Sequence, residues 1–151
     1  MLKKSLLQRA ALLALLSSSA LAHAAEALSI DVYRDPNCGC CKEWIKHMSE
    51  NGFTVHDHVE PNMSAVKERL GVAPRLASCH TGVINGKFVE GHVPAEQVKT
   101  LLGRSDLRGL AVPGMPMGSP GMEMGDHKEK YEVIGLTQAG KDEVVAQYPG
   151  H

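Results

Sequence analysis

The sequence predicts a single α/β domain with a mixed β-sheet and flanking helices, preceded by a cleavable leader. Strand-like and helix-like segments alternate through the first half of the chain, which is typical of parallel strands joined by crossover helices. Further on, Asn85-Gly86 separates two β-rich runs, and Asn-Gly is a strong signal for a tight antiparallel hairpin. A sheet that contains both kinds of pairing is therefore expected.

Residues 1–24 have the layout of a secretory signal peptide. A short basic region, MLKKSLLQR, precedes the apolar run ALLALLSSSALA and the small-x-small cleavage site Ala22-His23-Ala24. The apolar run is too short for a stable membrane anchor, and the leader has neither a twin arginine nor a cysteine at the cleavage site. We predict cleavage near Ala24, export to the periplasm and a mature domain over residues 25–151. A buried N-terminal helix is the alternative, but the run lacks polar periodicity.

Charge excludes two classes of partner. Loss of Lys3, Lys4 and Arg9 with the leader lowers the number of basic residues from 16 to 13, against 17 acidic residues. The remaining basic residues do not cluster into a stripe. Nucleic acids and anionic membrane surfaces are therefore not expected as partners.

The first half of the domain alternates between two periodicities. Alternating apolar and polar residues predict strands at 28–35 and 53–60, and apolar spacing of three and four residues predicts helices at 41–52 and 62–71. Gly52 and Gly71 stand at the predicted C-terminal ends of the two helices.

The second half begins with the hairpin in 82–93, after which Pro94 is expected at the first position of a helix that ends before Gly103. Residues 107–125, LRGLAVPGMPMGSPGMEMG, are rich in Met, Gly and Pro. This composition predicts a long functional loop without a regular helix or a central strand. Residues 130–148 predict a C-terminal β-hairpin around 138–141.

The predicted export takes four cysteines, Cys38, Cys40, Cys41 and Cys79, into an oxidising compartment. One interpretation of this even number is that they form two structural disulfides. The first three are too crowded to link distant segments, and a bridge between adjacent Cys40 and Cys41 would be strained. A purely structural or interaction domain with inert bridges remains the third hypothesis, after the two developed next.

The predicted order β-α-β-α-β-β-α, with cysteines between the first strand and the first helix, looks like a thioredoxin-type fold. Cys38 and Cys41 stand at C-x-x-C spacing, where a helix N-terminus stabilises a thiolate and the second thiol lies one turn on. This favours a thiol–disulfide oxidoreductase in which Cys38 attacks and Cys41 resolves. Whether the protein is an enzyme stays open, because Cys40 departs from the ordinary redox pattern.

A soft-metal site is the leading hypothesis. Counting back one strand length from the Asn85-Gly86 turn places Cys79 and His80 beside the cysteine motif, where thioredoxins have a cis-proline. Thiolate and thioether sulfur favour Cu(I), so the loop methionines favour copper over zinc. Zinc remains open, although zinc motifs usually show two separated cysteine pairs. The candidate ligands are Cys38, Cys40, Cys41, Cys79, His80, His92, Met115 and Met117.

The motifs DPNCGCCKEW, LASCHTG, VEGHVPA and GLAVPGMPMGSPGME together resemble a family of small exported bacterial proteins, the CopG-like proteins. The resemblance implies a thioredoxin-like fold and a periplasmic role in copper resistance, with Cu(I), in one or more ions, held by the C-x-C-C thiols and Cys79. It also implies a coupled redox change. The expected partners are copper ions, other periplasmic copper-handling proteins and a thiol reductant.

Overall fold

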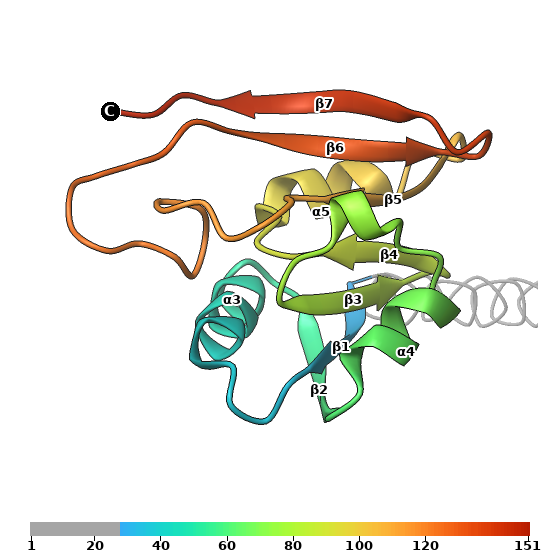
Figure 1. Cartoon of the computed structure of the whole chain (residues 1–151), viewed down its shortest axis with the longest axis horizontal. Helices are drawn as coiled ribbons and strands as arrows, with labels where there is room; N and C mark the ends of the chain where they lie inside the picture. Colours follow the sequence, from blue (N-terminus) through green and yellow to red (C-terminus); the bar gives the residue numbers. More distant parts are fainter. Residues whose placement is uncertain (1–27) are drawn as a thin grey trace, which may run out of the picture.

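The computed structural model describes residues 28–151, and the predicted signal peptide lies outside the described residues. The chain forms one seven-stranded sheet with helices packed against it (Figure 1). The strands are β1 Ser29–Arg34, β2 Thr54–Val59, β3 His80–Ile84, β4 Lys87–Glu90, β5 Leu107–Ala111, β6 Tyr131–Thr137 and β7 Asp142–Tyr148. The helices are α3 Gly39–Glu50, α4 Met63–Arg69, the short 3-10 helix η1 Pro74–Leu76 and α5 Ala95–Leu101. None of the helices in residues 28–151 is long and apolar enough to cross a membrane.

The sheet is mixed, as predicted. Its strand order is β2-β1-β3-β4-β5-β6-β7, with parallel pairing between β1 and β2 and between β4 and β5. The other neighbours are antiparallel, including the two hairpins β3–β4 and β6–β7. Both hairpins were expected from the sequence, and the second continues the main sheet through the β5–β6 pairing.

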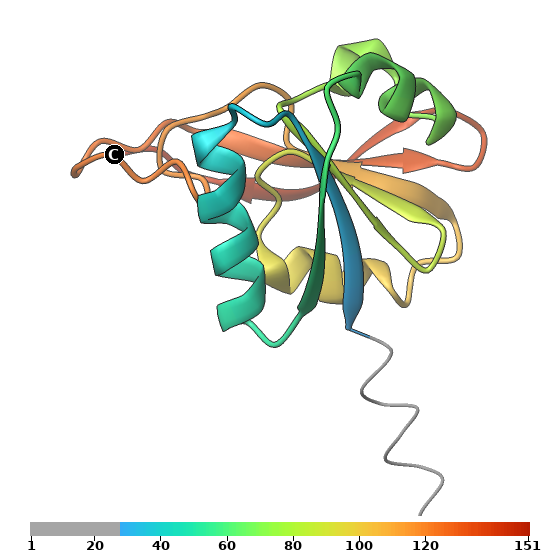
Figure 2. The ribbon, with the colours of Figure 1, turned by 90° about the horizontal axis from the view of Figure 1, so that it is seen from below.

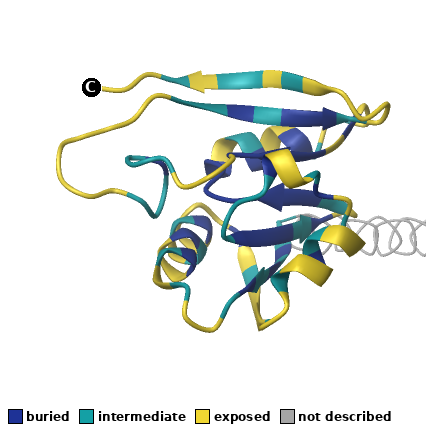
Figure 3. Cartoon of the chain, viewed as in Figure 1, coloured by how far each residue is buried: buried dark blue, intermediate teal, exposed yellow. Residues whose placement is uncertain are grey.

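The sheet is covered on both faces, with α4 and α5 on opposite sides (Figure 2). The larger core cluster joins Trp44 and Met48 of α3 to Val98 and Leu101 of α5, over one face of the sheet. A smaller cluster beside η1 and the end of α4 fills the other face, and it contains Val72, Leu76, Phe88, Ala111 and Leu136. Burial on both faces makes β3, β4 and β5 the most enclosed strands (Figure 3).

Backbone conformation confirms the turn prediction at Asn85-Gly86. Asn85 and Gly86 have φ of 49° and 72°, the left-handed pair that a two-residue hairpin turn requires. The adjoining register, Ile84 opposite Lys87, closes the hairpin directly on this turn.

The predicted loop over 107–125 is wrong in its first part, because Leu107–Ala111 forms β5 in the middle of the sheet. The prediction rested on the composition of the whole segment, but its first proline, Pro113, comes after the strand has ended. Gly109 supports the close strand contact, since a Cβ there would lie 2.4 Å from the Phe88 carbonyl oxygen. Residues 112–130 contain neither helix nor strand and form the Met/Gly/Pro-rich loop.

The start of α5 also differs from the prediction. Pro94 occupies the N-cap position in an extended conformation, and the helix begins one residue later, at Ala95. The Ala95 N–H donates to Nε2 of His47 at 3.1 Å. An imidazole from α3 thus satisfies a backbone donor that a helix start leaves without an intrahelical partner.

Candidate metal centre

The N-terminus of α3 gathers three cysteines. Cys38 is the N-cap residue, and Cys40 and Cys41 lie in the first turn. Unpaired N–H groups and the helix dipole at this end favour a thiolate. Cys38 and Cys41 form a disulfide with a Cα–Cα distance of 5.4 Å, whereas Cys40 is a free thiol. Cys41 is buried, and Cys38 and Cys40 are half-buried.

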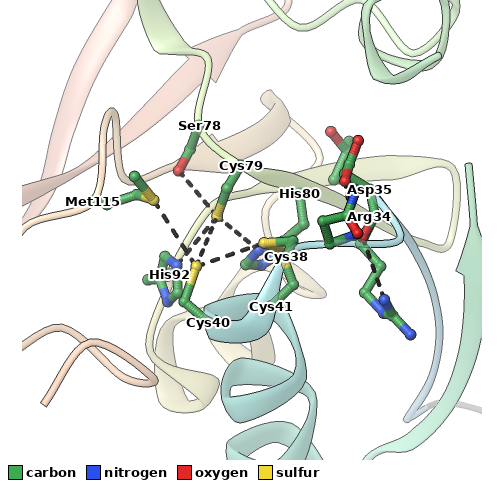
Figure 4. The surroundings of a disulfide bond; sticks show 12 residues. Arg34, Asp35, Cys38, Cys40, Cys41, Ser78, Cys79, His80, His92 and Met115 are labelled. Carbon is green, nitrogen blue, oxygen red and sulfur yellow. Dashed lines mark hydrogen bonds between the residues drawn. A yellow bond between two sulfur atoms is a disulfide. The ribbon is translucent and has the colours of Figure 1, made fainter. Parts of the chain in front are cut away.

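The segment between η1 and β3 brings the fourth cysteine to the same place. Sγ of Cys79 lies 3.9 Å from Sγ of Cys40, which in turn lies 3.5 Å from Sγ of Cys38 (Figure 4). All four cysteine sulfur atoms lie within 4.8 Å of one another. Cysteines from two distant parts of the chain therefore form one cluster around Cys40.

Two buried histidines adjoin the cluster. Sγ of Cys79 is 3.3 Å from Nδ1 of His80 and 3.2 Å from Nε2 of His92, so these three residues form a second group of closely spaced donors (Figure 4). Nδ1 of His92 lies 2.7 Å from the Pro120 carbonyl oxygen. Because a carbonyl can only accept, Nδ1 carries the proton and Nε2 presents its lone pair towards Cys79.

His80 is enclosed by aromatic packing. Its ring lies 4.4 Å from the ring of Trp44, centroid to centroid, and 5.1 Å from that of His92. Trp44 is fully buried and donates its indole N–H to the Val93 carbonyl at 2.9 Å. Within residues 28–151, Nε2 of His80 is the one buried side-chain nitrogen or oxygen atom without a hydrogen-bond partner. An unpaired buried nitrogen is costly in a fold that gives it no further role.

The Met/Gly/Pro-rich loop closes over the start of α3 and contributes one sulfur. Sδ of Met115 lies 3.9 Å from Sγ of Cys40, and Met115 is half exposed. Met117 is held instead by its backbone N–H, which donates to Glu129, and the structure records no contact of its sulfur with the described cysteines. Gly121 lets this loop pack closely on α3, because a Cβ at position 121 would lie 2.8 Å from the backbone nitrogen of Trp44 and 3.1 Å from Nδ1 of His92.

These donors fit a soft metal ion better than a hard one. Sulfur and imidazole nitrogen suit copper and zinc, whereas magnesium and calcium prefer carboxylate and carbonyl oxygen. The two groups share Cys79, so the described residues offer a thiol-rich part and a mixed sulfur–nitrogen part side by side. The nitrogen atoms that face the sulfur of Cys79 are Nδ1 of His80 at 3.3 Å and Nε2 of His92 at 3.2 Å.

Comparison with known proteins places these residues in a family. Two solved structures, forms 1 and 2 of the copper resistance protein CopG, are 65% identical to this chain, each with a TM-score of 0.80. The alignments cover 82% and 81% of this chain and 99% and 98% of the solved chains. The chain belongs to the CopG family. Residues 76–122 also match a family described as a protein of unknown function, DUF411, and none of the curated proteins matches.

The DUF411 match covers one part of the site. The DUF411 segment includes Cys79, His80, His92 and Met115, whereas the C-x-C-C motif precedes it. The CopG alignments extend over four-fifths of the chain. The resemblance inferred from the sequence motifs is therefore confirmed.

In this CopG-family chain, burial keeps Cys79, His80 and His92 uncharged without a metal. Desolvation raises the pKa of the Cys79 thiol to about 12, with a further contribution from Cys40. Burial lowers the pKa of His80 well below its usual range and also lowers that of His92. At neutral pH Cys79 is thus a thiol and His80 and His92 are neutral imidazoles, so a metal that bound Cys79 would have to displace its proton.

These shifts predict how the stability of the metal-free protein depends on pH. The histidine pKa values are lower in the folded state than the 6.5 of an unfolded chain, so below pH 6.5 the unfolded state binds more protons. We expect the free energy of unfolding to fall as pH decreases from 6.5 to 5, by up to about 1.4 kcal/mol per pH unit for each histidine. Urea unfolding at several pH values measures this slope.

A variant tests the assignment of the slope. His80→Phe keeps an aromatic ring against Trp44 and removes one of the titrating groups, so it should reduce the slope, while His92 and His47, whose pKa values burial also lowers, still contribute. A stability of the unaltered protein that stays constant between pH 5 and 6.5 would contradict the prediction. At the alkaline end, the raised pKa of Cys79 predicts a second loss of stability above pH 9.

Some residues of the site were not found from the sequence. Glu90 is fully buried, and its carboxylate accepts the backbone N–H of Ser78, next to Cys79. Pro120 orients His92 through its backbone carbonyl. A signal for Glu90 was available, since alternation places it on the same inward face of β4 as Phe88. The part played by Pro120 depends on the path of a loop and has no equivalent sequence signal.

Proposed function

We propose that this protein binds Cu(I) in the periplasm and contributes to copper resistance, through thiolates of Cys38, Cys40, Cys41 and Cys79. The convergence of four sulfur atoms within 4.8 Å carries the proposal. Thiolates that close can each bridge neighbouring ions, so the site suits more than one Cu(I). His80, His92 and Met115 complete the ligand set, and Met117 is the weakest candidate on its observed contacts.

Copper is favoured over zinc by two observations. Met115 places a thioether beside Cys40, and thioethers bind Cu(I) well. Both solved relatives are named as copper resistance proteins. Export follows from the predicted signal peptide, and the expected partners are copper ions, other periplasmic copper-handling proteins and a thiol reductant.

We also infer that the part of the chain from β1 to α5 is a thioredoxin-like unit. The element order β-α-β-α-β-β-α and the strand order β2-β1-β3-β4 support this inference. So does the position of the C-x-x-C pair at the start of the first described helix. On this view β5, β6, β7 and the loop over 112–130 are an addition to the unit, and the addition supplies Met115.

Redox change would control copper occupancy. Closing the Cys38–Cys41 disulfide by exchange with a partner disulfide passes two electrons and two protons to that partner, which leaves as a dithiol, and it takes two sulfur ligands from the site. Reduction by a dithiol partner returns both ligands while the partner becomes a disulfide. The disulfide form should therefore hold copper less tightly than the reduced form.

A thiol–disulfide oxidoreductase is the second candidate, and the formed Cys38–Cys41 bridge at a helix N-terminus favours it. Cys38 is half-buried and Cys41 fully buried, which suits an attacking and a resolving thiol respectively. Disulfide exchange needs only these two cysteines. Cys40, Cys79 and Met115 would then have no part in the chemistry.

Titration of the fully reduced, metal-free protein with Cu(I) tests the proposal. We expect one or more Cu(I) per chain and protection of the four thiols from alkylation. Four thiols that react freely in the presence of Cu(I) would exclude the copper site. The reduction potential of the Cys38–Cys41 pair would then become the quantity that defines the function.

A further inference from the structure

A buried carboxylate lies directly beneath the segment that carries Cys79. The side chain of Glu90, at the end of β4, is fully inaccessible to solvent. Its Oε1 accepts the backbone N–H of Ser78 at 2.7 Å and also contacts the ammonium group of Lys67. Its Oε2 accepts the hydroxyl of Thr81 at 2.5 Å. One side chain therefore uses both oxygens on partners from the same short segment.

Those partners bracket two of the proposed ligands. Ser78 and Thr81 flank Cys79 and His80, so the carboxylate fixes the chain on both sides of this dipeptide. The β3–β4 register supports the arrangement, because Thr81 pairs with Glu90. Gly91 allows the end of β4 to lie close to Ser78, since a Cβ at position 91 would lie 2.6 Å from the side chain of Ser78.

Ionic pairing with Lys67 alone does not explain why a carboxylate is buried at position 90. Lys67 of α4 compensates the buried charge, and it also donates to Oγ1 of Thr81 at 3.0 Å. However, replacing a buried ion pair by apolar residues of similar size is often neutral for stability or even stabilising. The distinctive property of Glu90 is that it accepts hydrogen bonds from both ends of the Cys79–His80 segment.

We infer that Glu90 is a positioning residue for the metal site, holding Ser78 and Thr81 so that Cys79 faces Cys40 and His80 stays against Trp44. The inference rests on the proposed copper function. Glu90 acts through Cys79 and His80, because its carboxylate contacts neither sulfur nor imidazole in the described structure. Changes to such supporting residues typically lower metal affinity by roughly 10- to 100-fold.

Two double variants separate hydrogen bonding from charge. Lys67→Met combined with Glu90→Gln removes both charges, while the amide can still accept from Ser78 and donate to Thr81. Lys67→Met combined with Glu90→Leu removes the same charges and both hydrogen bonds. We expect Cu(I) affinity within about threefold of the unaltered protein for the first variant and at least about tenfold weaker for the second. Equal affinities in the two variants would overturn the inference.

A copper-free measurement keeps this test independent of the proposed function. With Cys38→Ser and Cys41→Ser as background, diamide should join the two remaining thiols, whose sulfur atoms lie 3.9 Å apart. The Lys67→Met/Glu90→Leu chain should close this disulfide several-fold more slowly than the Lys67→Met/Glu90→Gln chain. If the unaltered protein bound no copper, the copper proposal would be refuted, and a rate difference here would still support the positioning role. Equal closure rates would refute the positioning role.

A milder change covers the case in which the leucine variant does not fold. Thr81→Val removes the hydrogen bond to Glu90, together with the one that Thr81 accepts from Lys67, and keeps the shape of the side chain. Thr100→Val is the matched control, because the Thr100 hydroxyl donates within α5 to the Glu96 carbonyl. We expect Cu(I) affinity to fall several-fold in Thr81→Val only, and equal affinities in the two would overturn the inference.

Discussion

Cys40→Ser is expected to lower Cu(I) affinity by more than about a hundredfold. Sγ of Cys40 is the central atom of the cluster, with Cys38 at 3.5 Å and both Cys79 and Met115 at 3.9 Å. Serine is nearly isosteric, but its hydroxyl oxygen is a poor ligand for a soft ion. Loss of supporting residues alone costs roughly 10- to 100-fold in metal affinity, and loss of a shared ligand should exceed that.

Competition with a chromophoric Cu(I) chelator measures the affinity of the reduced protein. Met124→Leu is the matched control, since it removes a sulfur from the same loop at a side chain that is 65% exposed. The Cys38–Cys41 disulfide should still form in Cys40→Ser, because neither of its sulfur atoms is altered. If Cys40→Ser left the copper affinity unchanged while Cys38→Ser abolished disulfide reductase activity, the oxidoreductase function would replace the copper proposal.

Local signals allowed most of the fold to be predicted. The Asn85-Gly86 turn needs only two residues that tolerate positive φ. The alternation of apolar and polar residues in β1 and in β2 can be recognised within each strand's own sequence. β5 was missed because its burial depends on β4 and β6 on either side, while its own sequence, LRGLA, shows weak alternation next to a proline-rich segment. A central strand of this kind is defined by its neighbours more than by its own residues.

Some residues of the candidate site could likewise be predicted from local signals, and others could not. Cys79 could be placed beside the C-x-C-C motif because a hairpin of known type fixes the distance from its turn to the strand start. Met115 and Met117 could not be distinguished, since the path of an irregular loop decides which sulfur reaches Cys40. Glu90 lies in the motif VEGHVPA, and alternation places it on the inward face of β4, but its hydrogen bonds to Ser78 and Thr81 follow only from tertiary contacts.

Trp44→Ala is expected to reduce the free energy of unfolding by about 3–5 kcal/mol. Trp44 is fully buried in the larger core cluster, and alanine would leave a cavity between α3 and the sheet. The change also leaves the Val93 carbonyl without its indole donor and removes the ring that packs on His80. The same residue therefore links the stability of the core to the geometry of the metal site.

Urea unfolding followed by circular dichroism measures the effect, since Trp44 is the single tryptophan and its fluorescence is lost in the variant. Trp44→Phe is the control, because it keeps a ring beside His80 and loses only the hydrogen bond and part of the volume. It should cost less than half as much stability as Trp44→Ala. In the disulfide-intact protein, a loss below about 1 kcal/mol for Trp44→Ala would be too small for a large core side chain. That result would mean that α3 does not pack on the sheet through Trp44, and the enclosure of His80 would then need another explanation.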